Sequence, residues 1–136
     1  MTDSDLPLVL VVDDYQDARD MYAESLRVSG FRVAEATTGL EAVARARALG
    51  PDAVLMDLSL PGIDGWEATR QLKADPATAH IPVVAITGHA SPIASDLARE
   101  AGCASFVLKP ALPDVVVREV RRLLDGTQAG RPVAGS

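Results

Sequence analysis

Five polar residues stand directly after short apolar runs of strand length, where a buried core would not select them. They are Asp13, Asp14, Asp57, Thr87 and Lys109. Three carboxylates held close together repel one another, and their pKa values rise unless a cation shares the site. Oxygen donors without His or Cys favour Mg²⁺, which keeps several waters for incoming phosphate oxygens. These residue types therefore indicate phosphoryl transfer assisted by Mg²⁺ and Lys109, with one carboxylate as the nucleophile.

This chemistry requires a scaffold that brings the ends of separate strands together. Four runs are apolar throughout, which is typical of strands buried on both faces. They are Leu8–Val12, Ala53–Met56, Val83–Ile86 and Phe106–Leu108. A fifth run, Phe31–Ala36, alternates apolar and polar residues, so we expect it to have one solvated face and to lie at an edge of the sheet.

Segments with a helical spacing of apolar residues follow the strands. The first ends at Gly30, and the second begins with a capping box, Thr38–Glu41, and ends near Gly50. The third begins after Gly65 with Asp64 as its N-cap, and the fourth has Ser91 as N-cap and Pro92 in its first turn. The fifth begins near Pro113 and ends near Asp125.

Five alternating strands and helices predict an α/β fold, a doubly wound parallel sheet of the (βα)5, flavodoxin-like type. With the strand order 2-1-3-4-5, the first and third strands are neighbours at the switch point, where ligands bind outside the carboxyl ends of the strands. The three aspartates would then converge, with Thr87 and Lys109 beside them. We expect one domain at residues 1–125 and a flexible tail at 126–136, because the tail has no apolar period.

The overall composition argues against several classes of partner. The 136 residues carry a formal net charge of -6, which does not suit binding to a nucleic acid backbone or to an anionic membrane. Cys103 is the only cysteine, so an internal disulfide and a Cys-based zinc site are excluded, and a reducing, cytoplasmic location is expected. The acidic N-terminus does not resemble a signal peptide, and no apolar run is long enough for a membrane span.

The sequence resembles the receiver domains of two-component response regulators, especially the single-domain chemotaxis regulators. The resemblance covers residues 7 to 125 and rests on LVVDD (10 to 14), MDLSLPGIDGWE (56 to 67), PVVAITGHA (82 to 90) and AGCASFVLKP (101 to 110). These segments follow the family's order and spacing. The resemblance implies a phosphorylation-gated signalling module in a phosphorelay, which receives its phosphoryl group from a histidine kinase or a histidine phosphotransfer protein.

The resemblance also implies roles for the acidic cluster. Asp57 would be the phosphoacceptor, Asp14 a direct Mg²⁺ ligand and Asp13 a second acidic residue that acts mainly through water. The backbone carbonyl of Ser59 would complete the protein ligands, and Mn²⁺ could take the place of Mg²⁺. Ser59 and His89 occupy positions that modulate the lifetime of the phosphoryl group in the family.

Further positions match the part of the family that senses phosphorylation. Thr87 and Lys109 would each bind a phosphoryl oxygen, and Phe106 matches the switch aromatic that turns inward as Thr87 moves. The Lys109–Pro110 bond would be cis, as an X-Pro bond can be. Output would run through the face formed by the fourth helix, the fifth strand and the fifth helix, to a protein target that the sequence does not identify. The chain would be a monomer or a phosphorylation-dependent homodimer.

Two other functions compete with this hypothesis. A phosphatase of the haloacid dehalogenase class also uses an aspartyl nucleophile with Mg²⁺ and Lys, but it needs a second Asp two residues later, where this chain has Ser59. A pseudo-receiver would bind partners without phosphorylation, but such domains typically lose part of the acidic cluster or the lysine. We therefore expect no enzyme in the usual sense, because catalysis is limited to the domain's own phosphorylation and dephosphorylation.

Overall fold

Strands and helices alternate along the whole described part of the chain. The computed structural model describes residues 6–58, 65–88 and 92–129. The strands are β1 (Leu8–Val12), β2 (Arg32–Ala36), β3 (Ala53–Asp57), β4 (Val83–Thr87) and β5 (Ser105–Leu108). The helices are α1 (Gln16–Val28), α2 (Gly39–Leu49), α3 (Gly65–Ala74), α4 (Pro92–Ala101) and α5 (Pro113–Ala129). The predicted (βα)5 pattern is therefore confirmed.

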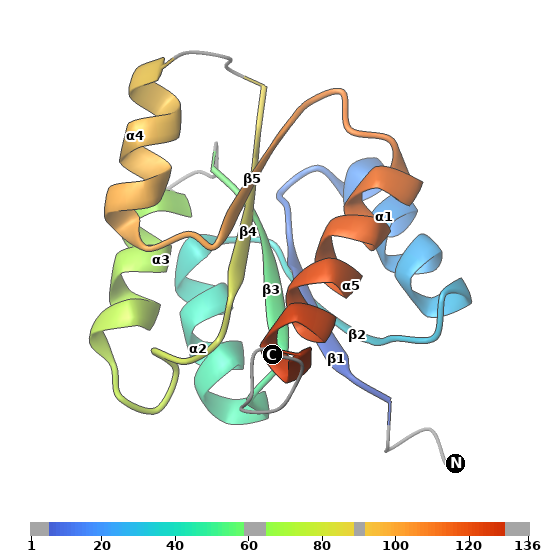
Figure 1. Ribbon diagram of the computed structural model, residues 1–136, viewed down its shortest axis with the longest axis horizontal. Helices are drawn as coiled ribbons and strands as arrows, with labels where there is room; N and C mark the ends of the chain where they lie inside the picture. Colours follow the sequence, from blue (N-terminus) through green and yellow to red (C-terminus); the bar gives the residue numbers. More distant parts are fainter. Residues whose placement is uncertain (1–5, 59–64, 89–91, 130–136) are drawn as a thin grey trace.

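The strands form one parallel sheet in the order β2-β1-β3-β4-β5, as predicted (Figure 1). Val12 pairs with Met56, and Asp57, one residue further along β3, pairs with Ile86. Thr87 pairs with Leu108 on β5. Because these pairings leave little stagger between neighbouring strands, the carboxyl ends of β1, β3, β4 and β5 lie together at the same end of the sheet. The alternating strand β2 lies at one side of the sheet, where its pattern placed it.

Helices cover both faces of the sheet, and a buried apolar cluster fills each layer between helices and sheet. One face packs α2 and α3 against alternate strand residues such as Leu10, Val54 and Val83. The other face packs α1 and α5 against residues such as Val11 and Leu55. The half-buried Trp66, in the first turn of α3, packs against the first cluster. Strands covered on both faces need apolar residues at every position, which explains the unbroken apolar runs of β1, β3 and β4.

Helix α1 ends just before Gly30, as predicted. Gly30 has φ +97°, a left-handed conformation that glycine adopts at low cost. Its N–H donates to the carbonyl of Arg27, and the N–H of Phe31 donates to that of Leu26 at 3.0 Å. This pair of bonds is a Schellman motif, which satisfies carbonyls at the helix end.

The capping box of α2 differs by one bond from the expected form. The N–H of Glu41 donates to the Thr38 hydroxyl at 3.1 Å, as predicted. The Glu41 carboxylate, however, accepts from the N–H of Thr37 at 2.6 Å instead of that of Thr38. Both ends of the motif therefore still satisfy backbone donors. The predicted N-caps Asp64 and Ser91 lie outside the described residues.

Two expectations about the last elements were wrong in detail. We expected Phe106–Leu108 to be buried on both faces, but β5 is the second edge of the sheet, and Leu108 is 44% exposed. We expected the fifth helix to end near Asp125, but α5 continues to Ala129. A helix can include a residue such as Gly126 at a cost of about 1 kcal/mol relative to alanine, so this glycine does not end it. The rest of the predicted tail, residues 130–136, lies outside the described part of the chain.

Candidate functional site

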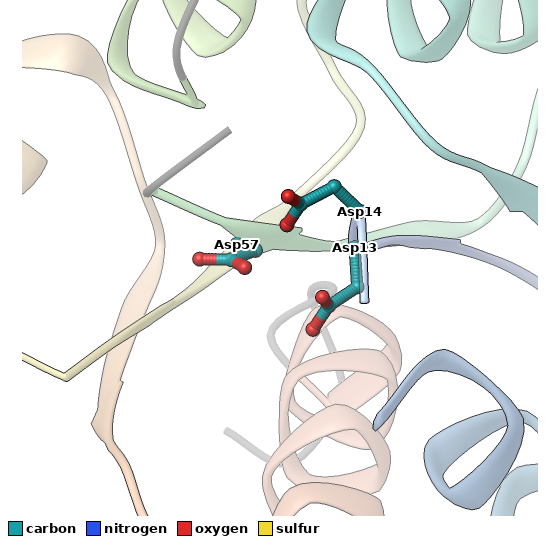
Figure 2. Close-up of side chains that lie close together, drawn as sticks. All are labelled: Asp13, Asp14 and Asp57. Carbon is teal, nitrogen blue, oxygen red and sulfur yellow. The ribbon is translucent and has the colours of Figure 1, made fainter. Parts of the chain in front are cut away.

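Three aspartates converge at the carboxyl ends of the two strands at the centre of the topology. Asp13 and Asp14 directly follow β1, and Asp57 is the last residue of β3. Each of them offers a carboxylate oxygen within 4.8 Å of the others. Figure 2 shows the side chains meeting from the two neighbouring strands. Asp13 and Asp57 are buried, whereas Asp14 is exposed, so the cluster is open to solvent through Asp14.

Lys109, which follows β5, supplies positive charge beside the cluster. Its Nζ lies 3.2 Å from Oδ2 of Asp57 and 3.9 Å from Oδ2 of Asp13. The N–H of Lys109 donates to the carbonyl of Thr87 at 2.7 Å, which ties the lysine to the end of β4. Burial alone would lower the pKa of Lys109, but the carboxylates of Asp57 and Asp13 outweigh it and raise that pKa. The ammonium group is therefore held in its charged form beside Asp57.

The environment of Asp13 favours a bound cation. Burial raises the pKa of Asp13, and the carboxylate of Asp57 raises it further. The N–H of Tyr15 donates to Oδ1 of Asp13 at 2.9 Å and acts in the opposite direction. One lysine offsets only part of the charge of three carboxylates. A hard divalent cation suits this set of oxygen donors, because the cluster as formed by the described residues contains no imidazole or thiolate.

Three of the other predicted residues lie on or just after β4 and β5, and two lie outside the described residues. Thr87 is the last residue of β4 and is buried. Phe106, on β5, pairs with Ala85 and packs half-buried against the core. The Lys109–Pro110 bond is cis, in agreement with the resemblance. Ser59 and His89 lie outside the described residues, so their roles stay predictions.

Residues 9–121 match the family model of the response regulator receiver domain. The chain belongs to this family. The receiver is 35% identical over 102 residues to the polar-differentiation response regulator DivK of Brucella ovis, covering 75% of this chain and 83% of that protein.

Solved structures agree with this assignment. A CheY-like receiver domain protein from Methanospirillum hungatei JF-1 has a TM-score of 0.84 at 25% identity, covering 90% of this receiver and 97% of that chain. The chemotaxis response regulator CheY4 of Vibrio cholerae has a TM-score of 0.82 at 25% identity, covering 87% and 98% of the two chains. This receiver is thus similar to chains that contain little beyond one receiver domain. Within its described residues, no helix combines the length and the apolar character that a membrane crossing requires.

Sequence reasoning on this receiver missed the structural importance of Gly65, the first residue of α3. A Cβ atom at this position would lie 2.7 Å from Cα of Leu58 and would also clash with the carbonyl oxygen of Asp57. Helix α3 therefore starts directly against the end of β3. The Asp64–Gly65 pair indicated a helix start, but it gave no sign of this contact with the main chain of Asp57.

Sequence reasoning also missed two side chains of α1 that bind the site's main chain. Arg19 donates through Nη1 to the carbonyl of Asp13 at 3.0 Å. The hydroxyl of Tyr22 donates to the carbonyl of Ala111, two residues after Lys109, at 3.2 Å. In the sequence, Tyr22 belongs to the apolar stripe of the helix, which gives no sign of a polar contact.

Proposed function

We propose that this receiver takes a phosphoryl group onto Asp57 with the help of Mg²⁺ and passes the resulting change to a protein partner. The observation that carries the proposal is the 3.2 Å contact between Lys109 Nζ and Asp57 Oδ2 within a cluster of three carboxylates. A buried carboxylate with a fixed cation beside it, at the switch point of the sheet, suits a nucleophile in phosphoryl transfer.

The proposed reaction is a displacement at phosphorus. A carboxylate oxygen of Asp57 attacks the phosphorus atom and forms an O–P bond. The P–N bond of a phosphohistidine, or the P–O bond of a small acyl phosphate, breaks and its electron pair leaves with the donor. Lys109 stabilises the negative charge on the phosphoryl oxygens, and the hydroxyl of Thr87 donates a hydrogen bond to one of them.

The residues that would hold the metal ion are Asp13, Asp14 and Asp57, together with the carbonyl of Ser59 that the family resemblance implies. Bound Mg²⁺ would offset the charge of the carboxylates and of the phosphoryl oxygens, and Mn²⁺ could supply the same chemistry. Asp14 is exposed, which suits a ligand that exchanges with water. Asp13 keeps one oxygen on the N–H of Tyr15, which suits an indirect role.

The proposed output is a shift from the inactive to the active conformation of β4 and β5. Thr87 and Phe106 would move inward when phosphorylated Asp57 stabilises the active conformation. Strand β5 lies between α4 and α5 (Figure 1), and its half-exposed side chains border a surface groove. The groove is lined by Phe106, Val107, Leu108, Val115, Arg118, Glu119 and Arg122. A downstream protein or a second copy of the chain would bind this face, so the domain would be a monomer or a phosphorylation-dependent homodimer.

The proposed setting is a cytoplasmic phosphorelay. The donor would be a histidine kinase or a histidine phosphotransfer protein, as the receiver family implies. The net charge of -6 speaks against direct binding to nucleic acid. The domain would catalyse only its own phosphorylation and dephosphorylation, without turnover of another substrate.

The decisive experiment is intact-mass spectrometry after incubation with acetyl phosphate, with and without Mg²⁺. Wild type should gain one phosphoryl group only with Mg²⁺, and Asp57→Asn should gain none. Asp114→Asn, at an exposed position of α5, is the matched control and should be labelled like wild type. Labelling of Asp57→Asn would refute the assignment of the nucleophile. Absence of labelling in wild type that binds Mg²⁺ would favour a phosphorylation-independent binding module.

A further inference from the structure

Helix α1 makes contact with both chain segments that carry the site. Arg19 and Tyr22 lie nearly one turn apart on this helix, so their side chains leave it on neighbouring positions. Arg19 reaches the segment after β1, which contains Asp13 and Asp14. Tyr22 reaches the segment after β5, which contains Lys109. Helix α1 is thus hydrogen-bonded both to the segment that holds Asp13 and Asp14 and to the segment that holds Lys109.

Arg19 holds the main chain of Asp13 from a nearly buried position. Its side chain is only 14% exposed. Nη1 donates to the carbonyl of Asp13 at 3.0 Å, and Nε donates to Oε1 of Glu35 on β2, also at 3.0 Å. Arg27 contacts the other oxygen of Glu35 at 3.4 Å. The planar guanidinium group therefore joins the Asp13 segment to the neighbouring strand in a fixed geometry, which an ammonium group cannot reproduce.

Tyr22 holds the segment after β5 from inside the core. The side chain is 3% exposed, and its hydroxyl donates to the carbonyl of Ala111 at 3.2 Å across 89 residues of sequence. Tyr22 and Ala111 belong to the same buried cluster. Ala111 follows Lys109–Pro110, so this bond anchors the main chain that presents the lysine to Asp57.

We propose that Arg19 and Tyr22 are positioning residues that act on separate halves of the site. Arg19 sets the Asp13 segment and so the affinity for Mg²⁺, whereas Tyr22 sets Lys109 and so the rate of phosphoryl transfer. The inference rests on the proposed function, because it assumes that the cluster binds Mg²⁺ and that Lys109 assists the transfer. Small displacements of charged groups in such sites have large effects on rate.

The test compares two substitutions that each remove one of these bonds. Tyr22→Phe removes only the hydroxyl, and Arg19→Lys keeps the positive charge but loses the planar fork. For each variant, the Kd for Mg²⁺ and the phosphorylation rate from acetyl phosphate at saturating Mg²⁺ are measured. Tyr22→Phe should lower the rate about three- to tenfold and change the Kd less than about twofold, as expected for one lost hydrogen bond. Arg19→Lys should show the reverse pattern.

Thr78→Val is the matched control for the loss of a buried hydroxyl. Thr78 lies after the end of α3, and its hydroxyl donates to the carbonyl of Leu72, within that helix, at 2.7 Å. The Thr78 side chain is buried, as the Tyr22 side chain is. This variant should lower the unfolding midpoint and leave both the Kd and the rate unchanged. If Arg19→Lys does not fold, Glu35→Gln weakens the same arginine's second bond and replaces it in the comparison.

A chemical readout separates this inference from the proposed function. The chain has two lysines, Lys109 and Lys73, and Lys73 donates to the carbonyls of Ala79 and Ile81. Acylation by an amine-reactive ester, measured by peptide mass spectrometry, should rise at Lys109 relative to Lys73 in Tyr22→Phe, because the lysine is less firmly held against Asp57.

Failure of the proposed function and failure of the positioning roles give different results. If wild type takes no phosphoryl group, the proposed function fails, but the labelling ratio and the Kd for Mg²⁺ still test the positioning roles. The inference is overturned if Tyr22→Phe changes neither the rate nor the labelling of Lys109. It is also overturned if both variants change the Kd and the rate in the same proportion, as general loosening would.

Discussion

Among single residues, Gly65 shows how closely the site depends on the packing beneath it. The first residue of α3 touches the main chain of Asp57 and Leu58, so there is no space for even one methyl group. The start of α3 thus packs against the main chain of Asp57, while Lys109 contacts its carboxylate. Asp57 is therefore fixed by contacts to its main chain as well as by contacts to its side chain.

Gly65→Ala should therefore destabilise the protein and disturb the site. Overpacking against backbone costs about 1–3 kcal/mol, because the neighbouring main chain must move. Gly88→Ala is the control, since a Cβ at Gly88 would meet nothing within 4 Å, and its change should stay below about 1 kcal/mol. Chemical denaturation measures both variants. Equal midpoints for the two would contradict the close contact at Gly65.

The site residues could be predicted to different degrees. The convergence of Asp13, Asp14 and Asp57 followed from their places at strand ends, because the strand order fixes which ends meet. The bond between Tyr22 and Ala111 could not be foreseen, because it joins distant segments and depends on how far α1 lies from the chain after β5. A tyrosine on an apolar stripe is consistent with plain packing.

Among the elements, α1 and α5 are joined at the end of the sheet opposite to the site. Nη2 of Arg121, on α5, donates to the carbonyl of Ser29 at the end of α1 at 2.7 Å. Its guanidinium carbon also lies 5.2 Å from the centre of the Phe31 ring. A cation at a helix C-terminus and over an aromatic ring is favourable on both counts. This contact complements the Schellman motif that ends α1.

Arg121→Met should lower the free energy of unfolding by about 1–2 kcal/mol, since it removes a hydrogen bond to a helix end and a cation–π contact. Arg118→Met, one turn earlier on α5, is the matched control. Among the residues that the structure describes, Arg118 forms an exposed ion pair with Asp114 at 3.5 Å, and its loss should cost less than about 1 kcal/mol. Thermal or urea unfolding would decide, and equal losses would show that the contact with α1 adds nothing.

The capping box of α2 predicts a pH effect. The N–H of Thr37 is the main cause that lowers the pKa of Glu41 below its ordinary value of 4.5. A lowered pKa in the folded state gives stability above that ordinary value, and this stability is lost as the pH falls through the folded pKa. Glu41→Gln should lower stability at neutral pH and show a smaller further loss in acid. Parallel pH profiles of the two proteins would contradict this prediction.

The elements themselves were largely predictable, and the errors have physical causes. The alternation in Phe31–Ala36 located the edge strand β2, because a solvated face leaves a period of two. The run in β5 gave no such sign, since an edge strand that borders a groove can also be apolar. The end of α5 was misjudged because Gly126 weakens a helix without ending it.

In the whole molecule, the unfavourable charge at one end of the sheet should couple metal binding to stability. Mg²⁺ that binds only the folded state should raise the free energy of unfolding, by about 2.7 kcal/mol when its concentration is 100 times its Kd. The unfolding midpoint should rise accordingly. EDTA should reverse the effect, and Asp14→Asn should reduce it. Asp96→Asn, at an exposed position of α4, should respond like wild type. A wild-type midpoint that Mg²⁺ does not change would contradict metal binding by the acidic cluster.

The position of Trp66 gives the molecule an optical reporter of its own. It is the only tryptophan of the chain, half-buried, and it follows the glycine that rests on the main chain of Asp57. Its fluorescence emission should therefore respond when a ligand rearranges the end of β3, and no label would need to be attached. Mixing experiments could then follow ligand arrival at the site in real time, on the unmodified protein.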